Sequence, residues 1–189
     1  MTDSEEVADE ASESPLNMML NASPGFARFS FFFGLWAVVI DVINIAIGAY
    51  AQGQKVVWAG FLSMGRFADN TYVAHAEQGF TGGDAAFSLI AIAFLGFGCA
   101  AIHSQVEGGL AAWLKGLVEP QRWSSLVSTA AGTNATIGAW SLLAGLLFYI
   151  GWSINYNTWV DPGVYAVSAP LVAFGIAFQR LGMTDEIDG

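Results

Sequence analysis

The chain has 189 residues, of which 54% are hydrophobic, 14% aromatic and only 12% charged. A soluble globular domain carries about twice that charged fraction, so the composition favours a chain that is solvated mainly by lipid. The formal charge of -10 is concentrated at the two ends, because nine of the 16 acidic residues lie in segments 1–27 and 185–189, which contain no Lys or Arg. The body of the chain is nearly neutral and has no basic stripe, which excludes nucleic-acid binding.

Four stretches of the sequence are long and apolar enough to cross a bilayer. A membrane-spanning helix needs about 20 mostly apolar residues, because its rise must cover a hydrocarbon core of roughly 30 Å. The first stretch is interrupted only by Asp41, and the fourth is short and contains Pro170. The predicted spans are residues 29–50, 85–106, 126–152 and 163–179.

This pattern predicts an all-α integral membrane protein that folds as a four-transmembrane-helix bundle. We expect a disordered acidic N-terminal tail over residues 1–27, a membrane domain over 28–182 and an acidic C-terminal tail over 183–189. The first span follows acidic residues and is too long for a signal-peptide core, so we expect it to remain in the mature protein.

Lys and Arg residues predict the orientation of the spans, since they are enriched in cytoplasmic loops. A cytoplasmic N-terminus places four of the six bases inside and two outside, so we expect both termini in the cytoplasm. The inner bases are Arg28, Lys115, Arg122 and Arg180, and the outer ones are Lys55 and Arg66.

The two longer connections are expected to pack rather than to hang free. Residues 51–84, on the outer side, are too apolar for a free linker and should pack on the bundle or at the outer interface, with residues 79–83 as a flexible lead into the second helix. In the inner connection, residues 110–118 repeat apolar positions at helical spacing. This segment reads equally as a helix along the inner membrane surface or as two aromatic anchors flanking a short turn. Five tryptophans at predicted span ends or in loops are interpreted as members of an aromatic belt at the interfaces: Trp58, Trp113, Trp123, Trp152 and Trp159.

Small residues at a four-residue spacing are typical of helices that approach closely within a membrane. Such rows occur in the second, third and fourth spans and favour a compact bundle. They are Gly96, Ala100, Ser104 and Gly108; then Ala131, Ala135 and Ala139; and finally Ala169, Ala173 and Ala177.

Asp41 is the most informative polar residue, because an ionised carboxylate within a span is expensive. It lies 12 residues into the predicted first span, about 18 Å along the helix, and should be protonated, hydrogen-bonded or facing a wet interior. Asn44 follows on nearly the same face, and we expect either side chain to contact the polar group Thr133, Asn134 and Thr136 of the third span. The contact would be a proton or cation site or, as the favoured interpretation, a polar link that fixes helix packing.

Neither a cofactor nor a metal site is predicted. His103 is the one histidine within a span, so the chain lacks two imidazoles at similar depth for bis-histidine haem ligation. A single axial ligand to a haem or chlorophyll through His103 is the remaining option, and an interfacial, partly hydrated side chain is the favoured one. The sequence has no Ser-His-Asp set, phosphate-binding Gly loop or HExxH motif, so we expect a protein that is not an enzyme.

The layout resembles that of MARVEL-domain tetraspan membrane proteins of the synaptogyrin and synaptophysin type. The features that carry the resemblance are four spans with both termini inside, residues 48–50 at the close of the first span, and the aromatic-rich end of the third span at residues 146–152. The chain departs from that group in lacking paired cysteines in a lumenal loop. The resemblance implies a protein of vesicle or plasma membranes that organises membrane and partners without catalysis, and it transfers no functional residue.

These observations favour a non-enzymatic tetraspan that organises the membrane or partner proteins, with a role in vesicle trafficking. Its expected partners are the lipid bilayer and other membrane proteins or a second copy of itself. Two alternatives stay open: a small channel or transporter subunit with Asp41 as its intramembrane site, and an accessory subunit of a respiratory or photosynthetic membrane complex that holds one pigment through His103.

Overall fold

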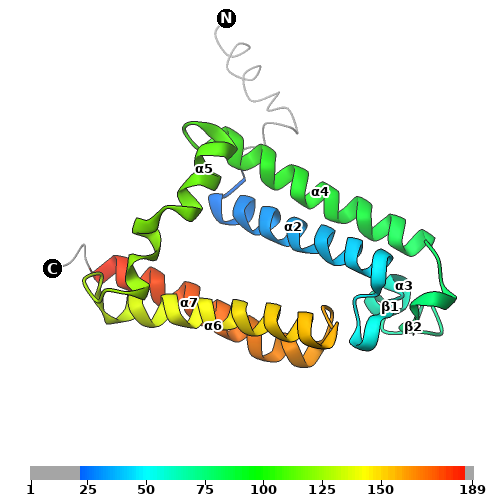
Figure 1. Ribbon diagram of the computed structural model, residues 1–189. Coiled ribbons are helices and arrows are strands. Elements are labelled where there is room, and N and C mark those ends of the chain that lie inside the picture. The colour runs from blue at the N-terminus through cyan, green and yellow to red at the C-terminus, as the bar shows by residue number, and fades with distance from the viewer. Residues whose placement is uncertain (1–21, 186–189) are drawn as a thin grey trace, which may run out of the picture. The chain divides into compact units, whose positions relative to one another are not determined.

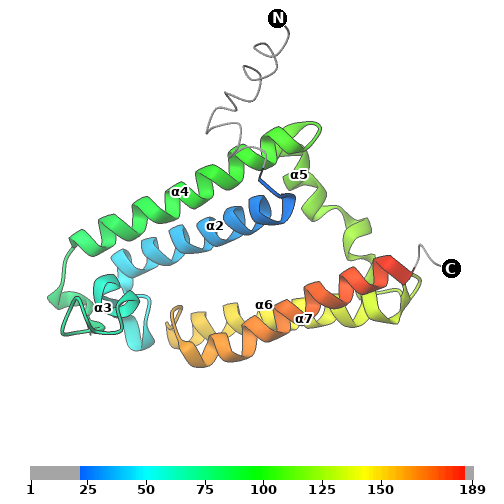
Figure 2. The same ribbon diagram turned by 180° about the vertical axis from the view of Figure 1, so that it is seen from behind.

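The computed structural model describes residues 22–185, and these residues are mainly helical. Figure 1 shows α2 and α4 side by side as one antiparallel pair and α6 and α7 as another, and the view from behind in Figure 2 agrees. The helices are α2 (Pro24–Ile47), α3 (Trp58–Leu62), α4 (Gly82–Gln105), α5 (Gly109–Val118), α6 (Gly132–Tyr156) and α7 (Pro162–Asp185), with short 3-10 turns at Ala51–Gly53, His75–Glu77 and Pro120–Leu126.

Within the described residues, four helices are long and apolar enough to cross a membrane: α2, α4, α6 and the part Pro162–Leu181 of α7. This number confirms the predicted four long apolar helices. The helices α2, α4 and α7 begin earlier than the predicted spans, whereas α6 begins six residues later than predicted and ends four residues later. The predicted acidic tails lie largely outside the described residues, as residues 1–21 and 186–189 do.

The chain forms two compact units, of which the first comprises Met1–Val38 and Ser88–Leu117. Here α2 and α4 approach closely at two glycines, since a Cβ atom at Gly34 would overlap the backbone of Leu95 and one at Gly98 would overlap that of Phe31. The predicted close-packing row is therefore wrong for this helix, because Gly96 has open space where a Cβ would stand. Glycine shortens the distance between helices only on the face that a neighbour occupies.

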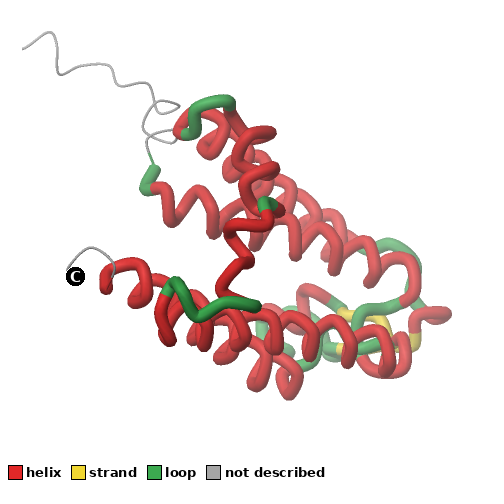
Figure 3. The backbone as a smooth tube through the Cα atoms, turned by 60° about the vertical axis from the view of Figure 1, so that its left-hand side comes forward, coloured by secondary structure: helices red, strands yellow, loops and turns green. Residues whose placement is uncertain are grey.

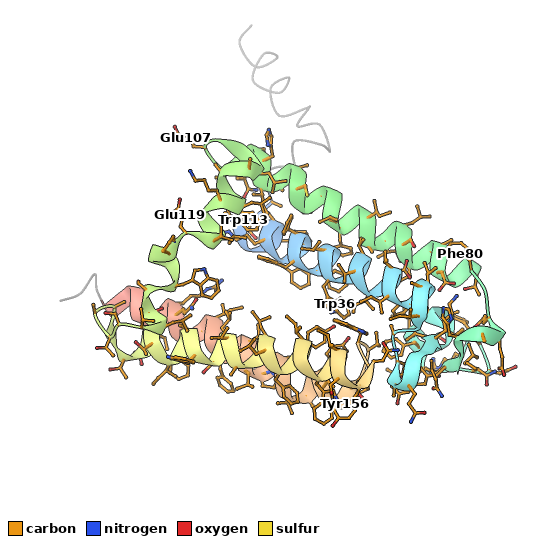
Figure 4. The ribbon with its side chains drawn as sticks, viewed as in Figure 1. Trp36, Phe80, Glu107, Trp113, Glu119 and Tyr156 are labelled. Atoms are coloured by element: carbon orange, nitrogen blue, oxygen red, sulfur yellow. The ribbon has the colours of Figure 1, made fainter. Side chains whose placement is uncertain are left out.

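The helix α5 agrees with one of the two interpretations of residues 110–118, a helix rather than a short turn between aromatic anchors. It follows α4 after a turn in which Gly108 and Gly109 have φ of 78° and 71°, a conformation that glycine adopts without strain. Figure 4 shows Trp113 between α5 and α2, where its ring meets Phe31 edge to face at a centroid distance of 5.1 Å. Trp113 is thus a core residue rather than an interfacial anchor, because Ala27, Phe31, Ala101 and Ile102 enclose it.

The second unit comprises Val39–Phe87 and Val118–Gly189, and α6 and α7 pack along their length within it. Glycines again carry the contact, because a Cβ at Gly138 would meet the backbone of Gln179 and one at Gly175 would meet that of Leu142. Ala135 and Ala139 of the predicted row in α6 are buried, as expected for a helix interface. Ala173 and Ala177 of the row in α7 face outward.

The connection between α2 and α4, residues 48–81, folds into a small substructure that we call the cap. Two short strands, β1 (Gln54–Val56) and β2 (Tyr72–Ala74), pair antiparallel with Lys55 opposite Val73. Figure 3 shows these strands in yellow beside α3. The cap also holds the connection between α6 and α7, because the backbone N–H groups of Trp159 and Val160 donate to the carbonyl of Ala49 at 2.7 and 2.8 Å. The expectation that the connection between α2 and α4 packs on the helices is confirmed.

Candidate functional site

The polar side chains that the sequence places in the first span gather where α2 meets the cap. Asp41 lies six residues before the end of α2, about 9 Å from that end, rather than in the middle of the helix. Asn44 lies one turn further on. Both side chains are buried, Asp41 with 3% of its surface exposed and Asn44 with none. Their partners therefore decide whether they can perform chemistry.

Asp41 is held by a tryptophan of the cap. The indole Nε1–H of Trp58 donates to Oδ1 of Asp41 at 2.9 Å. The same indole stacks on Phe87 of α4 with a centroid distance of 3.8 Å and an interplanar angle of 5°. Trp58 is itself buried, so it belongs to the core and not to the predicted aromatic belt. A buried indole needs an acceptor for its N–H, and Asp41 supplies it.

Asn44 clamps the strand β1 through both groups of its amide. Its Nδ2 donates to the carbonyl of Val56 at 3.0 Å, and its Oδ1 accepts from the N–H of Val56 at 2.7 Å and from that of Ala49 at 3.3 Å. The amide thus satisfies three backbone groups at a point where no strand or helix partner is available. Leaving such buried groups unpaired would be costly, which explains a polar side chain here.

The sequence interpretation missed the buried ion pair of the cap. Nζ of Lys55 lies 2.7 Å from Oδ2 of Asp84, and the two side chains are 2% and 1% exposed. Lys55 also donates to the carbonyl of Gly79 at 2.5 Å. A lysine of a predicted outer loop is normally solvated, so its apolar flanks were the only hint that it would be buried.

A capping box at the start of α4 completes this pair. Oδ2 of Asp84 accepts from the Thr81 N–H at 2.7 Å and from its hydroxyl at 2.9 Å, while the Thr81 hydroxyl accepts from the N–H of Asp84 at 3.3 Å. Thr and an acid three residues apart before an apolar run are a sequence signal for such a box. The lead into α4 is therefore fixed by hydrogen bonds, and the expectation of a flexible segment at residues 79–83 is wrong.

Further contacts tie the cap to α2 and fix the α6–α7 connection that the cap holds. Nε2 of His75 lies 2.8 Å from the carbonyl of Ile45, one of the last carbonyls of α2. The hydroxyls of Tyr149 and Tyr165 both donate to the carbonyl of Trp159, at 3.1 and 2.6 Å. In β2, burial and the neighbouring Tyr50 phenol raise the pKa of the Tyr72 phenol, so this group stays neutral over the physiological range.

The structure does not bring Asp41 or Asn44 to the polar group of the third span. Asp41 lies about 9 Å along α2 from the end of the helix at the cap. Thr133 lies about 35 Å along α6 from the last residue of that helix, which is next to the cap. The expected contact failed because α6 begins at Gly132, so Thr133, Asn134 and Thr136 occupy its first two turns. The hydroxyl of Thr136 donates locally, to the carbonyl of Gly132 at 3.2 Å.

His103 occupies the last turn of α4 and is exposed, as its interfacial interpretation expected. Its Nδ1 accepts the N–H of Leu110 at 3.4 Å, which ties the start of α5 to α4. Over residues 22–185, no group of three or more His, Cys, Asp or Glu side chains is arranged to hold a metal ion.

Comparison with known proteins adds no assignment. No family model matches the chain, and no curated protein or solved structure matches it.

Proposed function

We propose that the chain is a non-enzymatic, multi-pass membrane protein that organises the membrane or partner proteins. The four long apolar helices support its insertion. Each of them leaves large apolar side chains on its surface, as lipid-facing helices do, among them Val42, Leu89, Leu147 and Phe174. A role in vesicle or plasma membranes is the finer part of the proposal, and its support is the resemblance in layout to MARVEL-domain tetraspans.

The proposed orientation has both termini in the cytoplasm. What supports it is the direction of the helices at the cap, since α2 and α6 end there and α4 and α7 begin there. Four spans in that order return the chain to the side from which it started. The bases Arg28, Lys115 and Arg180 then lie on the cytoplasmic side.

One observation carries the structural interpretation of Asp41 and Asn44: both side chains bind the cap. Asp41 accepts from Trp58, and Asn44 bonds both backbone groups of Val56. An ionisable residue in a span is by default a candidate for transport. Here the hydrogen bond of Asp41 instead fixes the cap to α2, and such a fixed surface is what a scaffold for partners requires.

Substitution of Asp41 separates the scaffold from the transporter alternative. Asp41→Asn keeps an oxygen that accepts from the Trp58 indole but cannot carry a proton or neutralise a cation. We expect this variant to reach the membrane and to assemble like the wild type, with Asp69→Asn, an exposed cap residue, as the matched control. An ion or solute flux in proteoliposomes that Asp41→Asn abolishes and Asp69→Asn preserves would instead establish a channel or transporter subunit. Purification in mild detergent with identification of bound proteins would then define the partners.

A further inference from the structure

The cap carries a rigid turn that projects apolar side chains outward. The side chains of Met64 and Phe67 are 94% and 84% exposed, and that of Leu62 is 62% exposed. Leu62 is the last residue of α3, and Met64 and Phe67 lie in the turn that follows it, so three exposed apolar residues fall within residues 62–67, which we call the tip. Exposed apolar side chains grouped in this way mark an interaction surface.

Hydrogen bonds hold the tip in place, so its exposure is built into the fold. The N–H of Gly65 donates to the carbonyl of Gly60 at 2.8 Å, and the N–H of Phe67 donates to the hydroxyl of Ser63 at 2.9 Å. Met64 has φ of 53°, in the left-handed region that residues other than glycine adopt mainly in turns. A collapsed, buried arrangement of the tip would break these bonds.

The depth of α3 relative to the long helices indicates what covers the tip. The Trp58 indole bonds Asp41, about 9 Å below the end of α2, and stacks on Phe87, about 8 Å below the start of α4. Asn44, which lies in the last turn of α2, bonds the backbone of Val56. The strand leading into α3 therefore lies beside the last turns of α2 and the first turns of α4 and not beyond the ends of these helices.

That level corresponds to the border of the hydrocarbon core. Helices of 24 residues are about 36 Å long and exceed a core of roughly 30 Å by about 3 Å at each end. The helix α3 has five residues and a length of about 8 Å, and the headgroup region is about 5–7 Å thick. The end of α3 at Leu62 therefore lies no more than a few ångström beyond the interfacial layer, and the bonds of Gly65 to Gly60 and of Phe67 to Ser63 keep the following turn close to it.

We propose that Leu62, Met64 and Phe67 insert into the lipid interface, with Arg66 at the level of the phosphates. This inference rests on the proposed membrane insertion and adds a second, re-entrant contact with lipid. Arg66 is exposed between the apolar residues, and an arginine there can bind phosphate oxygens while its stem stays in the apolar layer. The exposed Asp69 marks the return of the chain to water.

Site-directed fluorescence quenching tests the proposal. In a Cys99→Ala background, an NBD label is attached to Met64→Cys, Phe67→Cys, Asp69→Cys or Leu89→Cys, and each protein is reconstituted into phosphatidylcholine vesicles with and without bromine near the top of the acyl chains. We expect brominated lipid to reduce the NBD emission at 64 and 67 and to leave it unchanged at 69. Leu89 is an exposed residue of α4 and reports on the span itself.

The outcomes separate the failure of this inference from that of the proposed function. Quenching at 89 without quenching at 64 and 67 refutes the lipid contact and leaves the spans intact. In that case, blue-shifted emission at 64 and 67 identifies a protein partner or a second copy on the tip, and unshifted emission identifies water. Absence of quenching at 89 as well refutes membrane insertion.

Discussion

The ion pair between Lys55 and Asp84 offers the sharpest test of how the cap is fixed. The two side chains are almost fully buried, and their charged atoms lie 2.7 Å apart. Removing one partner of a buried pair leaves an uncompensated charge and typically costs about 3–5 kcal/mol. Lys55→Met keeps the apolar stem and removes the ammonium. We expect a loss of about 3 kcal/mol, the low end of that range, because the N–H and hydroxyl of Thr81 still stabilise the carboxylate.

Equilibrium unfolding in mixed micelles measures this loss, and hydrogen exchange at the Val56 N–H shows whether the cap opens first. Lys115→Met removes an exposed base and should change the unfolding free energy by no more than about 0.5 kcal/mol. Adding Asp84→Asn to Lys55→Met removes the unpaired charge and keeps an acceptor for Thr81, so the double variant should be more stable than Lys55→Met alone. The reasoning fails if Lys55→Met behaves like Lys115→Met, or if Asp84→Asn lowers the stability of Lys55→Met further.

Two other predictions concern the helix contact and the amide clamp. Gly98→Ala places a Cβ against the backbone of α2 and should lower the free energy of unfolding by about 1–3 kcal/mol. Gly96→Ala has open space and should raise it by up to about 1 kcal/mol through helix propensity. Equal unfolding free energies for the two variants would contradict the observed helix contact. Asn44→Ala leaves the buried N–H and carbonyl of Val56 unpaired, at about 1–3 kcal/mol each, while Asn70→Ala, at an exposed position of the cap, should leave stability within about 0.5 kcal/mol of wild type. Hydrogen exchange of the Val56 N–H should accelerate in Asn44→Ala and not in Asn70→Ala.

The long helices were predictable because a long apolar run has few other uses. Their ends were less predictable, and the start of α6 shows why. Residues 127–131 carry no charge, so hydropathy joins them to the span that follows. In the structure they form turns, and α6 begins at Gly132, where φ is 86°. Small and hydroxyl residues are neutral in hydropathy but favour turns, and only backbone geometry separates the two roles.

The helix contacts were predictable in kind but not in position. A spacing of four between small residues identified Gly96, although the neighbour of α4 sits on the face that carries Gly98. Every face of an Ala- and Gly-rich helix offers such a row. The choice among faces depends on the residue that meets each glycine, here Phe31 of α2 against Gly98 and Leu95 of α4 against Gly34, and a single sequence contains no signal that pairs them.

The polar residues at the cap are better explained by the needs of helix ends than by chemistry. The last carbonyls and first N–H groups of a helix lack partners within the helix, and near the hydrocarbon border water satisfies them poorly. At this end of α2, the ring of His75 lies within hydrogen-bond distance of the Ile45 carbonyl. At the start of α4, the capping box of Thr81 and Asp84 accepts hydrogen bonds from the N–H groups of both residues. Asn44 performs this task for a strand that has no second neighbour. A buried polar residue within two turns of the end of a span therefore has a structural role to fill before any transport role, and Asp41, six residues from the end of α2, falls within that distance.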